Sequence, residues 1–133
     1  MTEEQRLKNL GVPTGPIDVV LDTDTFNEID DQFAIAYLLR AGADIRTAAI
    51  YAAPFFNANS TSPADGMEKS YDEIHKVLSL LGTSVPVFRG STRFLSDEKT
   101  PVASAAAEDL AARAMRYSPE HPLYVVAIGA ITN

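Results

Sequence analysis

The sequence predicts an α/β fold in which helices flank a parallel β-sheet of the Rossmann-like kind. Four apolar, β-rich segments lie along the chain, and helical segments separate each from the next. Parallel strands need a crossover of roughly a dozen residues, usually an α-helix, and the separating segments are long enough to supply it. The 133 residues, with 46% hydrophobic and 22% charged side chains, suit a single hydrophobic core.

The chain is expected to begin with a loosely attached polar arm at 1–16, followed by the α/β domain at 17–133. The first strand is predicted at about 17–22, around the apolar run VVL. A helix follows from Asp31 to Ala41 and ends at Gly42, because Gly is frequent just after helices. Its side chains are apolar nearly all round, which is typical of a helix buried on more than one side.

The second half of the chain continues the alternation of strands and helices. Its elements are, in chain order, a strand at Ile45–Ala52, a polar loop at 52–66, a helix at 67–81, a strand at Val85–Phe88, an Ala-rich helix from Pro101 to about Tyr117 and a strand at Leu123–Ile128. The last residues, GAITN, have the form of a turn into a further helix. We therefore expect the chain to be the N-terminal part of a longer domain, truncated after the fourth strand.

Charge and composition exclude several classes of partner. The formal net charge is −7 and the pI is about 4.7, which argues against nucleic acid or an anionic membrane. The chain has no cysteine, so it has no disulfide and no thiolate metal site. It shows no signal peptide, and no stretch reaches the roughly 18–20 apolar residues of a transmembrane helix. We therefore expect a cytoplasmic protein.

An acidic turn joins the first strand to the first helix. Its acidic residues, with no basic residue among them, are Asp22, Asp24, Glu28, Asp30 and Asp31. Bringing several carboxylates together is unfavourable unless a positive charge compensates them. In α/β sheets, ligands bind at the carboxyl ends of the strands, where this turn begins. The sequence therefore predicts a cation here, and carboxylate oxygens suit Ca²⁺ or Mg²⁺.

Ordinary local roles would also account for some of these residues. Asp30 could cap the helix, while Asp24 and Asn27 could simply form the turn. The number of acids without a counter-charge favours the cation. Asp22 and Asp24 share one face of an extended strand, and Asp31 opens a helix whose N-terminus favours negative charge.

The segment LDTDTFNEIDDQFAIAYLL resembles the N-terminal signature of the nucleoside hydrolases, the inosine-uridine-preferring ribohydrolases. In that signature a strand ends in Asp-x-Asp, and an Asp-Asp pair opens the next helix. Two further segments resemble the family in the same order: VPVFRG after a helix, and VVAIGAITN, a strand ending in a Gly-x-x-Thr-Asn turn. The resemblance covers about residues 17–133, although the turn from Asp24 to Asp30 is longer than the family's commonest spacing.

The resemblance implies a role for most residues of the acidic turn. Asp24 and Asp31 would ligate Ca²⁺ together with the backbone carbonyl of Thr132, and Asp24 would also be the general base for a metal-bound water. Asp30 would bond a ribose hydroxyl, and Asp22 would support the site from the strand. The implied activity is Ca²⁺-dependent hydrolysis of the N-glycosidic bond of a ribonucleoside, giving ribose and free base through an oxocarbenium-like transition state.

The loop at 52–66 contains two further candidates, and long loops in compact domains are often functional. The family has a ribose-binding Asn just after the second strand, so the resemblance implies that Asn57 or Asn59 contacts ribose. An insertion leaves the choice between them open, and either Asn would serve equally well as a turn former.

The family's late Asp and His, which complete the metal site and accompany the leaving base, have no counterpart in the 133 residues. We therefore expect this chain alone to bind Ca²⁺ weakly and to hydrolyse nucleosides slowly or not at all. The full-length protein is expected to form a homo-oligomer.

Two other functions fit parts of the sequence. VVLDTDT also fits the opening motif of the haloacid dehalogenase-type phosphatases, in which Asp22 would be the nucleophile, Asp24 the acid/base and Mg²⁺ the counter-ion. That family does not require an Asp-Asp pair at the next helix, and its later Lys and acidic pair cannot be located. The chain could instead be a non-catalytic interaction module, because a bare sheet edge favours pairing with another chain.

Overall fold

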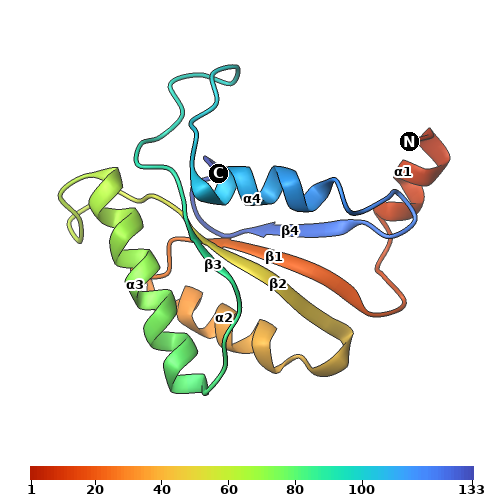
Figure 1. The fold of residues 1–133 in the computed structure, drawn as a ribbon, viewed down its shortest axis with the longest axis horizontal. Helices are drawn as coiled ribbons and strands as arrows, with labels where there is room; N and C mark the ends of the chain where they lie inside the picture. The colour runs from red at the N-terminus through yellow and green to blue at the C-terminus, as the bar shows by residue number, and fades with distance from the viewer.

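In the computed structural model, which describes residues 1–133, four parallel strands form one sheet. The strands are β1 (Ile17–Thr23), β2 (Ile45–Ala52), β3 (Val87–Arg89) and β4 (Leu123–Ala127). Their order across the sheet is β3-β2-β1-β4 (Figure 1). The predicted α/β fold, a parallel sheet with flanking helices, is thus confirmed.

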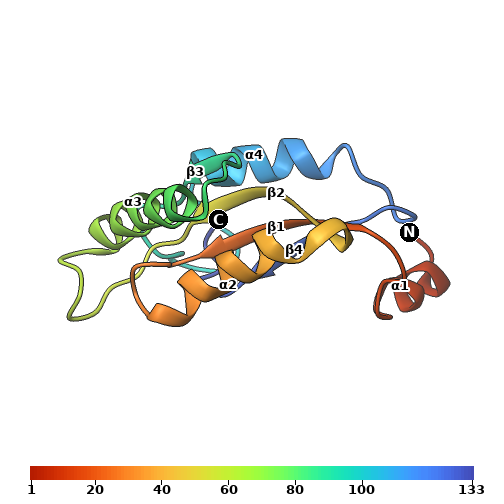
Figure 2. The same cartoon turned by 90° about the horizontal axis from the view of Figure 1, so that it is seen from below.

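Helices cover both faces of the sheet. They are α2 (Ile29–Arg40), α3 (Pro63–Leu81) and α4 (Ala105–Ala114), and a further helix, α1 (Glu3–Asn9), precedes β1. On one face, Ile35 of α2 and Ile74 of α3 share a core with Leu21 of β1. On the other face, Ala106 of α4 packs with Val20 of β1. Figure 2 shows α2 and α4 on opposite sides of the sheet. None of the helices is both long and apolar enough to cross a membrane.

The strand order creates a switch point between β1 and β4. From β1 the chain moves to β2 and then β3, and both connecting helices lie on the same face. It then returns over the opposite face through α4 and adds β4 on the other side of β1. The crossover that leaves β1 and the crossover that enters β4 therefore lie on opposite faces of the sheet, and ligands bind at such switch points in open α/β sheets.

Two helices begin away from their predicted starts because serine side chains cap them. α3 begins earlier than predicted, at Pro63, where Ser62 accepts a hydrogen bond from the Asp65 amide at 3.1 Å. Proline fits there because the first turn of a helix needs no hydrogen bond from its nitrogen. α4 begins later than predicted, at Ala105, after Ser104 accepts from the amide of the third residue of the helix at 3.0 Å.

α2 begins at Ile29, ahead of the predicted Asp31, and is less buried than its apolar sequence predicts. Only Asp31 and Ile35 of this helix are buried, while Phe33 and Tyr37 are exposed. The prediction that this helix is buried on more than one side is therefore wrong. The reason is that only the edge strand β4 lies beyond β1 on that side, and no further helix covers it.

The polar arm predicted at 1–16 contains α1, and two of its side chains contact the segment before β4. Thr2 caps α1 by accepting from the Gln5 amide at 3.1 Å. The side-chain amides of Gln5 and Asn9 donate to the carbonyl of Pro119 at 3.0 and 2.8 Å. α1 lies near the amino end of β1, far from the carboxyl ends of the strands (Figure 1).

Candidate functional site

The carboxyl end of β1 places two acidic side chains beside the end of β4. Asp22 and Asp24 are 4% and 8% exposed. The backbone carbonyl of Asp22 accepts from the amide of Ile128 at 2.9 Å, so the two strand ends stay in contact. Gly129 lies so close to Asp24 that a Cβ at this glycine would be 2.8 Å from Asp24 Oδ1. A side chain at position 129 would therefore force the Asp24 carboxylate to shift.

A third acid, Asp31, enters from the first turn of α2 and is 7% exposed. The Thr23 hydroxyl donates to Asp31 Oδ1 at 2.5 Å and lies 2.8 Å from the Thr25 hydroxyl. Because a hydroxyl carries one proton, Thr23 gives its own to Asp31 and accepts that of Thr25. Two buried threonines therefore orient Asp31, and its Oδ2 receives no hydrogen bond from the protein.

Burial makes the negative charges of these acids unfavourable. It raises the pKa of Asp22 to about 6 and also raises the pKa of Asp24 and of Asp31. The charge of Asp30 raises the pKa of Asp24 and Asp31 further. No Lys, Arg or His forms an ion pair with any of these residues. We call Asp22, Asp24, Asp30 and Asp31 the acidic corner.

The turn after β4 reaches the acidic corner. The Asn133 side chain donates from Nδ2 to Asp22 Oδ1 at 3.0 Å, which places the turn against that carboxylate. Thr132 is buried, and its carbonyl oxygen accepts from the Ser91 hydroxyl at 3.3 Å. A carbonyl oxygen has two lone pairs, so Thr132 keeps one for a further partner.

The remaining predicted residues, Asp30, Asn57 and Asn59, lie on the exposed rim. The side-chain amides of Asn57 and Asn59 donate to the Oδ1 and to the backbone carbonyl of Asn27, respectively. Asn27 in turn donates from Nδ2 to Asp24 Oδ2 at 3.1 Å. Asn57 Oδ1 also accepts from the backbone amide of Asn59 at 2.8 Å. This contact is the one expected if Asn57 forms the turn. Both asparagines thus fasten the loop after β2 to the turn after β1.

Several polar contacts of the site involve residues that the sequence does not single out. They are Thr23, Thr25, Ser91, Gly129 and Asn133. The two threonines alternate with the acids in the run DTDT, and this alternation is a local signal that could have identified them. Gly129 and Asn133 are the first and last residues of the Gly-x-x-Thr-Asn turn, whereas Ser91 belongs to no pattern that connects it to the acids.

The donor atoms of the acidic corner fit a hard cation. The carboxylates of Asp24 and Asp31 and the carbonyl of Thr132 offer only oxygen, which Ca²⁺ and Mg²⁺ prefer. No three or more His, Cys, Asp or Glu side chains converge on one metal position in the structure. A cation here would therefore need carbonyl, water and substrate oxygens as well. Ca²⁺ tolerates such a mixed shell, because it takes six to eight oxygen ligands in flexible geometry.

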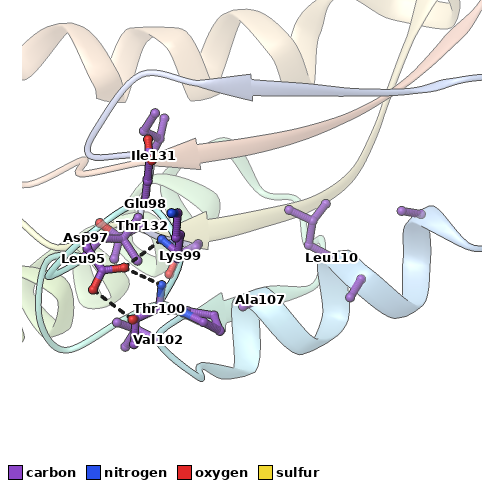
Figure 3. Close-up of a pocket in the computed structure, with 14 residues that line it drawn as sticks. Leu95, Asp97, Glu98, Lys99, Thr100, Val102, Ala107, Leu110, Ile131 and Thr132 are labelled. Carbon is purple, nitrogen blue, oxygen red and sulfur yellow. Dashed lines mark hydrogen bonds between the residues drawn. The ribbon is translucent and has the colours of Figure 1, made fainter.

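A cavity of about 640 Å³ lies beside the acidic corner. The loop after β3, α4 and the turn after β4 line it, and its apolar side chains include Leu95, Val102, Leu110 and Ile131 (Figure 3). Thr132 also lines this cavity, whereas no aspartate of the acidic corner does. The turn after β4 therefore separates the cavity from the carboxylates.

The chain matches no model of a known protein family, no curated protein and no solved structure in comparisons with all three. The chemistry of the site therefore has to be inferred from its own residues. Those residues form a buried, negatively charged end of a parallel sheet, with one uncommitted oxygen on Asp31 and a free lone pair on the carbonyl of Thr132.

Proposed function

We propose that the acidic corner binds Ca²⁺ and that the chain carries the metal- and ribose-binding part of a calcium-dependent N-ribohydrolase. The observation behind this proposal is a set of three buried carboxylates at the switch point between β1 and β4, with no basic side chain to balance them. A divalent cation would remove this imbalance. The resemblance of the same segment to the nucleoside hydrolases supports Ca²⁺ and a ribonucleoside as the ligands.

Each residue of the corner has a role in the proposed reaction. Bound Ca²⁺ would polarise a water molecule and hold the ribose hydroxyls. Asp24 is the general base: Asn27 fixes its Oδ2, and its carboxylate would take the proton of the polarised water. Asp30, on the exposed rim, accepts from a ribose hydroxyl. The fixed carboxylates of Asp24 and Asp31 favour the positive charge that develops on the sugar.

The position of Asp22 favours the ribohydrolase over the phosphatase. As the nucleophile of a phosphatase, Asp22 would have to reach a phosphoryl group that enters from solvent. Its side chain is buried, and its Oδ1 accepts a hydrogen bond from Asn133. A supporting role behind Asp24 agrees better with this environment.

Two properties of the whole protein belong to the same proposal. We propose a cytoplasmic location, which the absence of cysteine supports. We also propose that the protein is a homo-oligomer. Light scattering of the purified protein tests the second point, and a single monomeric mass would contradict it.

Calcium binding is the direct test of the proposed site. Isothermal titration of the purified chain with CaCl₂ should show binding, and Asp24→Asn and Asp31→Asn should each weaken the affinity about tenfold or more, since each removes a charged oxygen ligand. Asp44→Asn is the matched control, because Asp44 is exposed, forms no ion pair and lies outside the corner. Equal affinities in all four proteins, or no binding by the unsubstituted chain, would contradict the proposal.

Product analysis distinguishes the ribohydrolase from the phosphatase. Inosine or uridine should release ribose and free base slowly, and Asp24→Asn should abolish this release. Turnover should be slow because neither histidine is placed to protonate a leaving base: His75 packs on Tyr71 of α3, and His121 pairs with Ser118. Release of inorganic phosphate from a phosphomonoester, abolished by Asp22→Asn, would establish the phosphatase instead.

A further inference from the structure

The side chain of Asn133 makes hydrogen bonds to four other segments of the chain. Its Nδ2 donates to Asp22 Oδ1 at 3.0 Å and to the carbonyl of Ala52 at 3.3 Å. Its Oδ1 accepts from the Ser91 amide at 2.6 Å and from the Ser104 hydroxyl at 3.4 Å. A primary amide has two donor hydrogens and two acceptor lone pairs, so this side chain is fully satisfied.

The partners of Asn133 come from every strand end at this edge of the sheet. Asp22 belongs to the end of β1, Ala52 is the last residue of β2, Ser91 follows β3, and Ser104 caps α4. Asn133 itself follows β4. One amide group therefore fixes the positions of all four strand ends relative to one another.

The backbone at Gly90 packs tightly against the amide group of Asn133. A Cβ added at Gly90 would lie 2.0 Å from the carbonyl oxygen of Ala52 and 2.4 Å from Asn133 Nδ2. No side chain fits at such distances, so Gly90 is required for the chain to pass here. The glycine that follows β3 thus makes room for the amide group of Asn133.

The same contacts determine where the Thr132 carbonyl lies. Ser91 donates its backbone amide to Asn133 and its hydroxyl to the carbonyl oxygen of Thr132. Two consecutive residues of the turn after β4 are therefore held by one residue of the loop after β3. A displacement of the Asn133 side chain would release both the Asp22 carboxylate and this turn.

We propose that Asn133 is the positioning residue of the acidic corner: its Nδ2 orients the Asp22 carboxylate, and its contact with the Ser91 amide places the Thr132 carbonyl. The contact between Asn133 and Asp22 requires no bound metal. The consequence for the cation rests on the proposed function, because it requires that Ca²⁺ binds between the corner and Thr132.

A double-mutant cycle tests the contact between Asn133 and Asp22 without any metal. In the presence of a chelator, Asn133→Asp should lower the melting temperature by roughly 5 °C or more, because it sets two carboxylates against each other. Adding Asp22→Asn restores one amide and one carboxylate, so Asp22→Asn should raise the melting temperature more in the Asn133→Asp chain than in the unsubstituted chain. An equal effect of Asp22→Asn in both chains would overturn the proposed contact.

Calcium affinity tests whether the contact positions the site. Asn133→Ala should weaken the affinity for CaCl₂ about tenfold, the usual effect of losing a residue that orients metal ligands. Ser104→Ala is the matched control, since it removes the cap of α4 and one contact to Asn133 but none to Asp22. It should lower the melting temperature while the calcium affinity stays within about twofold.

Calcium affinities that fall equally in Asn133→Ala and Ser104→Ala would show a general loss of structure and overturn the positioning role. An unsubstituted chain that binds no calcium would overturn both the proposed function and the calcium part of this inference. In that case the cycle of melting temperatures still decides, independently, whether Asn133 holds Asp22.

Discussion

At the scale of single residues, the unusual feature is a buried carboxylate with no cationic partner. Asp22 is 4% exposed, and its one hydrogen-bond donor is the neutral amide of Asn133. Burial therefore dominates and raises the pKa of Asp22 to about 6, despite the opposing effect of that hydrogen bond. A charge held in this way makes the stability of the fold depend on pH.

In calcium-free buffer we expect the ionisation of Asp22 to lower the free energy of unfolding as the pH rises from about 4 to about 7. The pKa of Asp22 is about 6 in the folded chain and 3.8 without the fold, so the folded state holds the proton more tightly. The contribution of Asp22 to the free energy of unfolding is fully present below about pH 4 and is lost as the pH rises through about 6. A difference of two pKa units corresponds to about 3 kcal/mol.

Urea unfolding at a series of pH values measures the slope of the free energy of unfolding against pH. Asp22→Asn still accepts a hydrogen bond from Asn133 but cannot ionise, so its slope should be clearly smaller. Part of the slope should persist, because burial also raises the pKa of Asp24 and Asp31. The exposed control Asp44→Asn should retain the slope of the unsubstituted chain. Identical slopes in the unsubstituted chain and in Asp22→Asn would contradict the prediction.

At the scale of elements, α3 depends on a close approach between its first turns and the loop after β2. Gly66 is buried, and a Cβ added there would lie 2.1 Å from the carbonyl oxygen of Phe55. The approach anchors the loop whose asparagines reach the turn after β1. The packing of α3 is therefore linked to the geometry of the site.

Gly66→Ala should lower the free energy of unfolding by about 3 kcal/mol, because the added methyl group forces the helix away from the loop. Gly15→Ala is the control, since a Cβ at Gly15 meets no atom within 4 Å. Denaturant unfolding of both variants gives the comparison. A Gly66→Ala protein as stable as Gly15→Ala would show that the loop can move aside without loss.

At the scale of the whole molecule, the site depends on how the sheet is assembled. The chain places β4 next to β1 rather than next to β3, so the ends of β1 and β4 meet. A cation bound at that junction would join β1, α2 and the turn after β4. Such a ligand stabilises only the folded chain, and it should therefore raise the stability of the whole fold.

The melting temperature should rise with calcium concentration. At a free concentration 100 times the dissociation constant, linkage predicts about 2.7 kcal/mol, or roughly 10 °C for a chain of this size. Differential scanning calorimetry with CaCl₂ and with a chelator measures the shift, and Asp31→Asn should show little of it. The same melting temperature under both conditions would mean that the acidic corner holds no calcium.

Much of the fold follows from local sequence patterns. The apolar runs that become β1, β2 and β4 are short and bounded by turn residues, and the helices between them force a parallel arrangement. The helix starts were harder to predict. Ser62 and Ser104 decide them through single hydrogen bonds, and many serines in the chain could have served as caps.

Of the candidate site, the sequence likewise predicted some residues but not their contacts. Asp22, Asp24 and Asp31 were evident from the sequence because they lie within one turn and lack a basic neighbour. Asn57 and Asn59 were also evident, but their contacts to Asn27 became visible only in the fold. The burial of α2 on more than one side was wrongly predicted, because the apolar residues of a helix do not determine which flank of the sheet remains uncovered.

The sequence by itself determined that an excess of negative charge stands at the end of a buried strand, since charge and strand are both local properties. Only the tertiary structure decided what surrounds that charge. Asn133 and Asp22 are 111 positions apart in the chain, and Gly129, which follows β4, approaches Asp24, which follows β1. Contacts of this kind depend on the order in which strands join the sheet, which comes from the packing of all the elements together and from no single segment.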